Sequence, residues 1–139
     1  MKEIEIYIDG ASKGNPGPSS VGVVVCENGE TIKNIATFIG HATNNVAEYT
    51  ALIYGLQEGL ILGAESIKIN TDSQLLYRQL NKTYKIRSAN IIGLYNQAIH
   101  LMSAFKKVSM SHIPREKNRG ADKLANKAIK ETHKKSCSF

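Results

Sequence analysis

Acidic side chains stand at four points of the chain where a predicted strand or helix begins or ends. Asp9 closes an alternating run before a glycine, and Asp72 follows a short apolar run. Glu48 and Asp122 each lie in the first turns of a predicted helix. Because loops and helix N-termini meet at the carboxyl ends of strands in an open α/β sheet, these carboxylates can converge there. An all-oxygen ligand set suits a hard cation such as Mg²⁺ or Mn²⁺, and two such ions would suit phosphodiester hydrolysis.

Each acid also has a purely structural interpretation. Asp9 can begin an Asx turn, and Glu48 follows Asn45 by three residues, as in a capping box. Asp72 can cap a helix, and Asp122 complements a helix dipole. Taken singly the acids leave both interpretations open, and only together do they indicate a metal site.

The residues between the acids predict one α/β domain. Alternating or β-branched runs predict strands over about residues 4–9, 21–26, 31–40, 66–70 and 108–113. Apolar residues at helical spacing predict helices over about 44–63, 73–80, 91–105 and 120–132. The order β-β-β-α-β-α-α-β-α predicts a mixed five-stranded sheet with helices on both faces.

Turn and cap signals separate these elements. Residues 14–17, Gly-Asn-Pro-Gly, predict a loop after the first strand, and Asn28-Gly29 predicts a tight hairpin turn. Asn44 or Asn45 is expected to cap the first long helix. The predicted domain covers residues 1–134, and residues 135–139 are expected to form a short polar tail.

Composition excludes several classes of protein. With 139 residues, 42% hydrophobic and 22% charged, the chain is typical of one globular domain and not of a disordered protein. No apolar stretch approaches the roughly 18 residues that span a bilayer, and the start lacks the apolar core of a signal peptide. Cys26 and Cys137 cannot build a disulfide framework or a four-sulfur zinc site, so we expect a reducing, cytoplasmic setting.

The formal charge of +6 is concentrated near the C-terminus. Residues 103–139 hold ten Lys and Arg against three Asp and Glu, whereas residues 1–102 hold eight against nine. A basic segment of this kind predicts a polyanionic partner, with nucleic acid the first candidate. The alternative is a solvated helix face with a lysine-rich end.

Four blocks of the chain resemble the signatures of the ribonuclease HI family, in family order: 8–17 (IDGASKGNPG), 43–48 (TNNVAE), 70–74 (NTDSQ) and 112–126 (HIPREKNRGADKLAN). The resemblance spans about residues 3–130 and includes all four acids. It implies a ribonuclease H-like fold and a sequence-nonspecific endonuclease that hydrolyses the RNA strand of RNA–DNA hybrids, leaving 5′-phosphate and 3′-hydroxyl ends. We expect a monomer that needs neither a membrane nor a small-molecule cofactor.

The resemblance also implies residue roles. The four acids, Asp9, Glu48, Asp72 and Asp122, would hold two Mg²⁺ ions, with Mn²⁺ as a possible substitute. His112 matches a histidine that assists proton transfer or product release, although a histidine that ends a strand and bonds a carbonyl would look the same. The residues matched to hybrid contacts, many of them amides suited to 2′-hydroxyls, are Ser12, Asn15, Thr43, Asn44, Asn45 and Gln74.

One departure concerns substrate binding. Many bacterial relatives carry an extra basic helix and loop after the third block, where this chain has only residues 81–88 and no Trp. Tyr84, Lys85 and Arg87 could form a reduced binding edge there, or an ordinary solvated loop. An alternative function is therefore a weakly active or inactive hybrid-binding protein of the same fold. Another nuclease of that fold, such as an integrase or exonuclease module, fits the blocks less well.

Overall fold

The computed structural model describes residues 2–82 and 85–137, with side chains described as far as Lys130. The order of elements is the predicted one. The strands and helices are β1 (Glu3–Ser12), β2 (Gly17–Glu27), β3 (Glu30–Ala42), α1 (Asn44–Ile61), β4 (Ser66–Thr71), α2 (Gln74–Leu80), α3 (Ala89–Met102), β5 (Lys107–His112), the short 3-10 helix η1 (Arg115–Lys117) and α4 (Arg119–Cys137).

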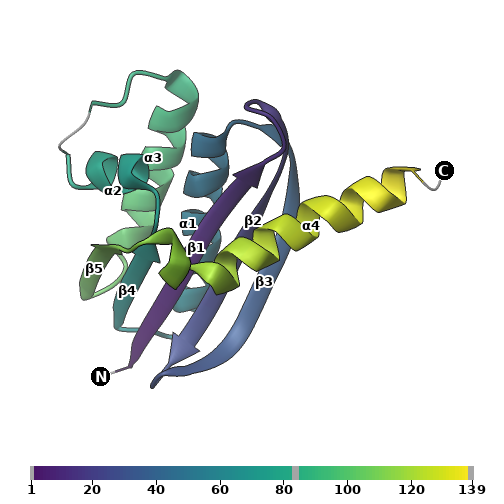
Figure 1. Ribbon diagram of the computed structural model, residues 1–139. Coiled ribbons are helices and arrows are strands. Elements are labelled where there is room, and N and C mark those ends of the chain that lie inside the picture. Colours follow the sequence, from purple (N-terminus) through teal and green to yellow (C-terminus); the bar gives the residue numbers. More distant parts are fainter. Residues whose placement is uncertain (1, 83–84, 138–139) are drawn as a thin grey trace.

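The strands form one five-stranded mixed sheet in the order β3-β2-β1-β4-β5 (Figure 1). β2 pairs antiparallel with both β1 and β3, and the predicted turn at Asn28-Gly29 joins β2 to β3. β4 lies parallel to β1, and β5 lies parallel to β4. The carboxyl ends of β1, β4 and β5 therefore meet at one end of the sheet.

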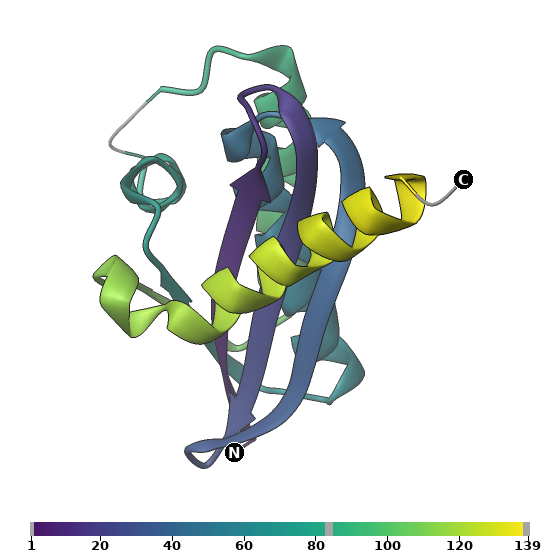
Figure 2. The same cartoon turned by 45° about the vertical axis from the view of Figure 1, so that its right-hand side comes forward.

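Helices cover both faces of this sheet, as predicted (Figures 1 and 2). α1 and α3 lie on one face, where alternate β1 residues such as Ile4, Ile6 and Ile8 are fully buried in the main core. α4 crosses the other face diagonally, and its Ala121 and Ala125 are fully buried. In the described part of the chain, no helix combines the length and the hydropathy needed to cross a membrane.

The first strand is longer than predicted. Asp9 does not close β1, because Gly10, Ala11 and Ser12 continue the pairing with β2 as far as Ser12↔Ser19. The hairpin between β1 and β2 extends the ladder past the glycine, which the alternating pattern did not indicate. As a result, the backbone of Asp9 is held within the sheet.

Two further predictions about the helices were wrong. Thr43, rather than Asn44 or Asn45, caps α1, and its hydroxyl oxygen accepts a hydrogen bond from the Val46 amide at 3.2 Å. The last helix runs to Cys137, past its predicted end at about residue 132, whereas the division into a domain over 1–134 and a tail over 135–139 stays a prediction. No glycine or proline interrupts residues 121–137, so nothing in the sequence stops the helix earlier.

A glycine sets the contact between α4 and the sheet. Gly22 of β2 lies beneath the first turns of α4, and a Cβ atom there would overlap the Ala121 carbonyl oxygen and lie 2.7 Å from the Ala125 nitrogen. The neighbouring Ser20 hydroxyl donates a hydrogen bond to the Ala125 carbonyl oxygen. The helix backbone therefore rests directly on the strand backbone.

We predict that Gly22→Ala lowers the free energy of unfolding by about 1–3 kcal/mol or more, because the new methyl group must push α4 away from β2. Gly93→Ala is the matched control, because a Cβ atom at Gly93 in α3 would meet no atom within 4 Å. That change should be neutral or stabilising by up to about 1 kcal/mol. Urea unfolding measures both variants, and equal midpoints for Gly22→Ala and the parent protein would contradict the close contact.

Candidate active site

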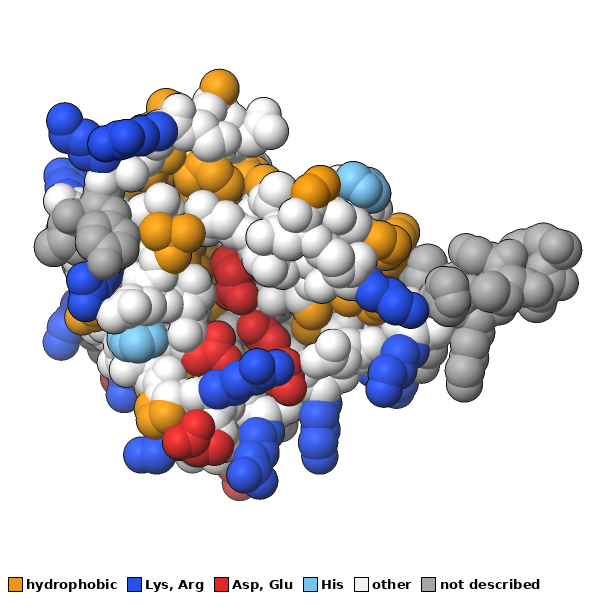
Figure 3. Space-filling model, turned by 45° about the horizontal axis from the view of Figure 1, so that its top comes forward, with side chains coloured by type: hydrophobic (Ala, Val, Ile, Leu, Met, Phe, Trp, Pro, Cys, Tyr) orange, Lys and Arg blue, Asp and Glu red, His pale blue; other side chains and the backbone are white. Residues whose placement is uncertain are grey.

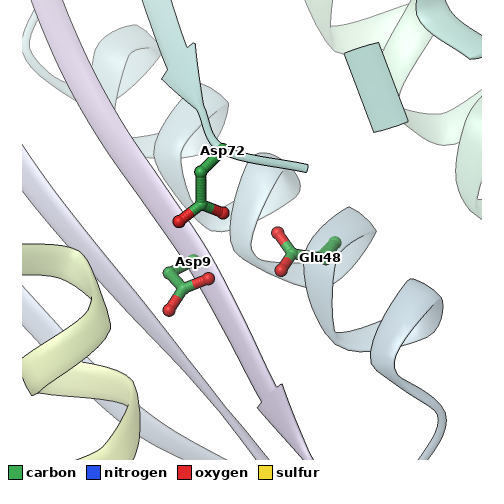
Figure 4. Close-up of side chains that lie close together, drawn as sticks. All are labelled: Asp9, Glu48 and Asp72. Carbon is green, nitrogen blue, oxygen red and sulfur yellow. The ribbon is translucent and has the colours of Figure 1, made fainter. Parts of the chain in front are cut away.

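Three of the predicted acids meet at the carboxyl end of the parallel strands (Figure 4). Asp9, Glu48 and Asp72 each offer a carboxylate oxygen, and these oxygens all lie within 4.8 Å of one another. The strand register explains the first pair. Ile8 of β1 is aligned with Thr71, the last residue of β4, so the residues that follow them, Asp9 and Asp72, lie side by side.

Glu48 reaches this pair because α1 approaches β1 closely. A Cβ atom on Gly10 would overlap the Ala47 carbonyl carbon and lie 2.5 Å from the Glu48 nitrogen, so only a glycine fits there. The pairing of β1 with β4 ends at Ile8, and the backbone amide of Gly10 donates a hydrogen bond to the Glu48 carboxylate. A glycine beside Asp9 thus places the second acid.

The fourth acid comes from α4 on the opposite face. Gly22 is the cross-strand partner of Asp9, and Ala121 rests on Gly22, so the next residue, Asp122, comes beside Asp9. All four predicted acids line one open hollow of about 400 Å³. The prediction that residues far apart in the sequence converge here is confirmed.

Burial, and after it repulsion between neighbouring carboxylates, disfavours the charged forms of the acids in the hollow. Asp9 is 6% exposed, and burial together with the charges of Asp72 and Asp122 raises its pKa to about 7. Burial and the charge of Asp9 raise the pKa of Glu48 well above its ordinary value. The Oε2 atom of Glu48 is buried and, within the described residues, has no hydrogen-bond partner. An oxygen-only set that lacks a counter-charge on its most buried members fits a hard divalent cation.

Two residues that the sequence reasoning did not select surround Asp122. Arg115 lines the hollow, and its guanidinium lies 3.6 Å from the Asp122 carboxylate. Asn126, one turn along α4, donates a hydrogen bond to the same carboxylate at 3.1 Å. The spacing of four between Asp122 and Asn126 was a signal for this contact, because such residues share one helix face.

Asn118 is a third residue that the sequence reasoning did not select. It is 1% exposed, and its side-chain amide donates a hydrogen bond to the Ile8 carbonyl oxygen at 2.9 Å. The backbone carbonyl oxygen of Asn118 accepts a hydrogen bond from the backbone amide of Asp122 at 3.1 Å. Asn118 therefore links the strand that carries Asp9 to the helix that carries Asp122.

His112 lies at the end of β5, outside the residues that line the hollow. Its ring stacks on Tyr77, with centroids 5.8 Å apart, and its Nε2 lies 3.3 Å from the Asp72 carbonyl oxygen. This geometry is that of a histidine that ends a strand and bonds a carbonyl. The side chain is exposed beside an acid of the site, so a role in proton transfer stays a prediction.

Two of the predicted hybrid-contacting residues line the hollow, and a third is hydrogen-bonded to one of them. Ser12 and Asn44 line the hollow. The Asn15 side-chain oxygen accepts a hydrogen bond from the backbone amide of Asn44 at 3.0 Å. The other three are arranged differently: Thr43 caps α1, Asn45 has a buried side-chain oxygen without a partner among the described residues, and Gln74 is exposed at the start of α2. Their contacts with a substrate stay predictions.

The predicted basic edge lies apart from the acids. Lys85 and Arg87 are exposed in the link between α2 and α3, and Lys85 lines a different hollow with Gln79 and Tyr95. Tyr84 lies outside the described residues. The structure therefore does not bring this edge into the acidic hollow, and its contact with a hybrid is untested.

The chain is similar to known proteins over most of its length. A family model described as "Reverse transcriptase-like" matches residues 7–128. A bifunctional protein of Mycobacterium tuberculosis is 39% identical over 129 residues, which cover 91% of this chain and 35% of that protein. Ribonuclease HI of Halobacterium salinarum is 39% identical over 127 residues, which cover 91% of this chain and 64% of that protein. The chain thus spans about a third of the mycobacterial relative and under two thirds of the archaeal one.

Solved structures agree with the sequence matches. The crystal structure of RNase H1 from Halobacterium salinarum gives a TM-score of 0.91 at 38% identity, covering 93% of this chain and 98% of that one. An RNase H1 named LC11, isolated from compost, was solved in complex with RNA/DNA hybrid. It gives a TM-score of 0.88 at 36% identity, covering 93% of this chain and 98% of that one.

The raised pKa of Asp9 predicts how stability depends on pH when no metal is bound. Its pKa is about 7 in the folded protein and 3.8 ordinarily, so between these values the folded state holds a proton that the unfolded chain releases. The resulting stabilisation is present at low pH and is lost as the pH rises through about 7. In chelator, the free energy of unfolding should fall from about pH 5 to about pH 8, on the order of 1–3 kcal/mol from this group.

Asp9→Asn should flatten this fall and make the metal-free protein more stable than the parent at about pH 8, because the buried charge is gone. Glu30→Gln is the matched control, since Glu30 is exposed at the far turn. Urea unfolding at the two pH values measures the effect. A parent protein as stable at the higher pH as at the lower one would contradict the repulsion described here.

Proposed function

This chain belongs to the ribonuclease H family, and from that premise we propose that it cleaves the RNA strand of RNA–DNA hybrids, leaving 5′-phosphate and 3′-hydroxyl ends. The observation that carries the proposal is the convergence of Asp9, Glu48, Asp72 and Asp122 on one open, oxygen-lined hollow. The hybrid seen with LC11 RNase H1, at 36% identity and a TM-score of 0.88, supports the same substrate class for this chain.

The four acids would hold two Mg²⁺ ions, for which Mn²⁺ could substitute. When bound, the ions would supply Lewis-acid stabilisation of charge at the phosphate and at the attacking and leaving oxygens. Cations also remove the conflict between the acids and an anionic substrate. Asp9 lies in β1 and Asp72 directly follows the adjacent strand β4. The sheet backbone therefore holds their carboxylates as a rigid pair of ligands.

The rim of the hollow supplies groups that suit a ribose. The Asn44 side-chain amide lines the hollow beside the acids and can both donate and accept hydrogen bonds. The Ser12 hydroxyl lines it too, but it donates to the Ala42 carbonyl oxygen at 2.9 Å and offers a ligand only an acceptor. Such groups bind a 2′-hydroxyl without selecting a base, so they favour an RNA strand of any sequence. Gln74, exposed at the start of α2, is proposed to contact the same strand. Contacts of this kind would let a nuclease distinguish sugars without reading sequence.

His112 is placed to help rather than to carry the reaction. Its ring is exposed next to Asp72, on an adjacent parallel strand, and an imidazole can exchange a proton near neutral pH. We assign it to proton transfer or to release of the cleaved product. The acids would remain competent without it.

The decisive test of the function is cleavage of end-labelled RNA–DNA hybrid, duplex RNA and duplex DNA, each with Mg²⁺, Mn²⁺ or chelator. The parent protein should cut only the RNA strand of the hybrid, and only with metal present. Asp9→Asn should lose nearly all cleavage while keeping its fold and its affinity for hybrid, and Asp72→Asn should behave in the same way. Glu30→Gln again serves as the matched control, with unchanged cleavage.

Three outcomes would count against this function. Near-normal cleavage by folded Asp9→Asn would remove the two-metal assignment, and comparable cutting of duplex RNA would remove the rim contacts. Hybrid binding by the parent without cleavage under any metal would favour the alternative of a hybrid-binding protein.

We predict that His112→Ala slows cleavage by about ten- to hundredfold, on the usual scale for help with proton transfer. His100→Ala is the matched control, because His100 is exposed in the last turn of α3. Single-turnover and steady-state rates measured together separate the chemical step from product release. A loss as large as that of Asp9→Asn, or no loss at all, would show that the role assigned to His112 is wrong.

A further inference from the structure

Positive charge gathers on the outer face of α4 and on the turn before it. The exposed cations there are Lys117, Arg119, Lys123, Lys127 and Lys130, which we call the basic ridge. In α4 they lie opposite the residues packed on the sheet, which are Ala121, Ala125, Ala128 and Ile129. At about 1.5 Å per residue, the ridge extends roughly 17 Å along the helix from Arg119 to Lys130.

The ridge carries positive charge that nearby acids do not balance. Four lysines outside the ridge pair with acids at 3.1–3.9 Å, in the pairs Lys2–Glu27, Lys33–Glu58, Lys68–Glu5 and Lys106–Glu65. Within the described residues, Arg119, Lys123 and Lys130 form no ion pair. The one described acid of α4, Asp122, turns toward the hollow. Neighbouring acids therefore do not cancel the charge of Arg119, Lys123 and Lys130.

The ridge begins where the acidic hollow ends. Asp122 and Asn126 line the hollow from one flank of α4, and Arg115 lines it from the 3-10 helix that precedes Lys117. In Figure 3, blue side chains surround the red acidic cluster and continue from it on the side where α4 runs. A long polyanion seated in the hollow thus meets a row of cations on one side.

We propose that the basic ridge binds the phosphate backbone of the RNA–DNA hybrid beyond the site of cleavage. This inference rests on the proposed function for the identity of the substrate. The ridge lengthens the contact with the hybrid along α4, and it supplies the affinity that this chain does not draw from an extra basic helix after α2. Its contacts are to phosphates, so they are independent of sequence.

The packing of α4 favours nucleic acid over an anionic membrane. A helix that lies on a bilayer inserts an apolar face next to its basic face. Ala121, Ala125, Ala128 and Ile129 of α4 are buried against the sheet, with at most 7% exposed, and Leu124 is half-buried. The ridge therefore offers charge alone, which suits a phosphate backbone.

The test compares two hybrids: the shortest one that the Asp9→Asn protein binds measurably, and one twice as long. Affinity is measured across a salt series in the Asp9→Asn background, so that the hybrid stays intact. The ridge variant is Lys123→Gln with Lys130→Gln, which removes both charges and keeps most of the side-chain length and the helix propensity. For the long hybrid, the log–log salt slope should fall by about two and the affinity by about ten- to hundredfold, whereas the short hybrid should be affected little.

Lys106→Gln with Lys107→Gln is the matched control, because it removes the same charge at the start of β5, the opposite end of the sheet from the acids. It should leave both affinities unchanged. Vesicles containing phosphatidylserine form a third arm, and circular dichroism confirms that each variant is folded.

The ridge proposal is overturned if the ridge variant binds both hybrids like its parent, or loses equal affinity for both. It is also overturned if the control variant loses as much as the ridge variant, or if only vesicle binding depends on the ridge. Failure of the parent protein to cleave any hybrid would instead reject the proposed function, because the binding comparison does not depend on cleavage.

Discussion

Repulsion between carboxylates in a half-buried hollow is the constraint on which the rest of the architecture depends. Burial and neighbouring charges raise the pKa of Asp9 to about 7, so folding must hold together groups that oppose one another. The fold does this with backbone contacts: the register of β1 with β4, the approach of α1 over Gly10, and the seat of α4 on Gly22. Side chains that carry the charge are free to face a ligand, because the main chain does the positioning.

Much of this arrangement could be predicted from the sequence, because its elements have strong periodicity and clear turn signals. Alternation revealed β1, helical spacing revealed α1, and the four acids stood out at the ends of elements. The unpredicted parts depend on tertiary contacts. Asp9 lies inside β1 because the hairpin continues past Gly10, and Asn118 bonds the Ile8 carbonyl across 110 residues of sequence. No local pattern encodes either contact.

Charge on this protein acts over two different ranges. The acids of the hollow would interact with a bound cation, and through it with a phosphate, over a few ångströms. The cations of α4 act over a distance comparable to the screening length, about 8–10 Å in physiological salt. α4 carries both kinds of charge, because Asp122 and Asn126 face the hollow while Lys123 faces outward. One helix thus belongs both to the reacting centre and to the surface that would attract its substrate.

The hydrogen bond between Asn15 and the start of α1 has a consequence for recognition. The Asn15 side-chain oxygen already accepts a hydrogen bond from the backbone amide of Asn44, which fixes the orientation of the side-chain NH₂ group. At this point the loop presents two N–H donors in a set direction. In a minor groove the acceptors, N3 of adenine and O2 of thymine, occur in every A·T pair in either orientation, whereas guanine adds a donor. A donor held in this direction and facing a minor groove would therefore meet the same acceptors in an A·T pair of either orientation.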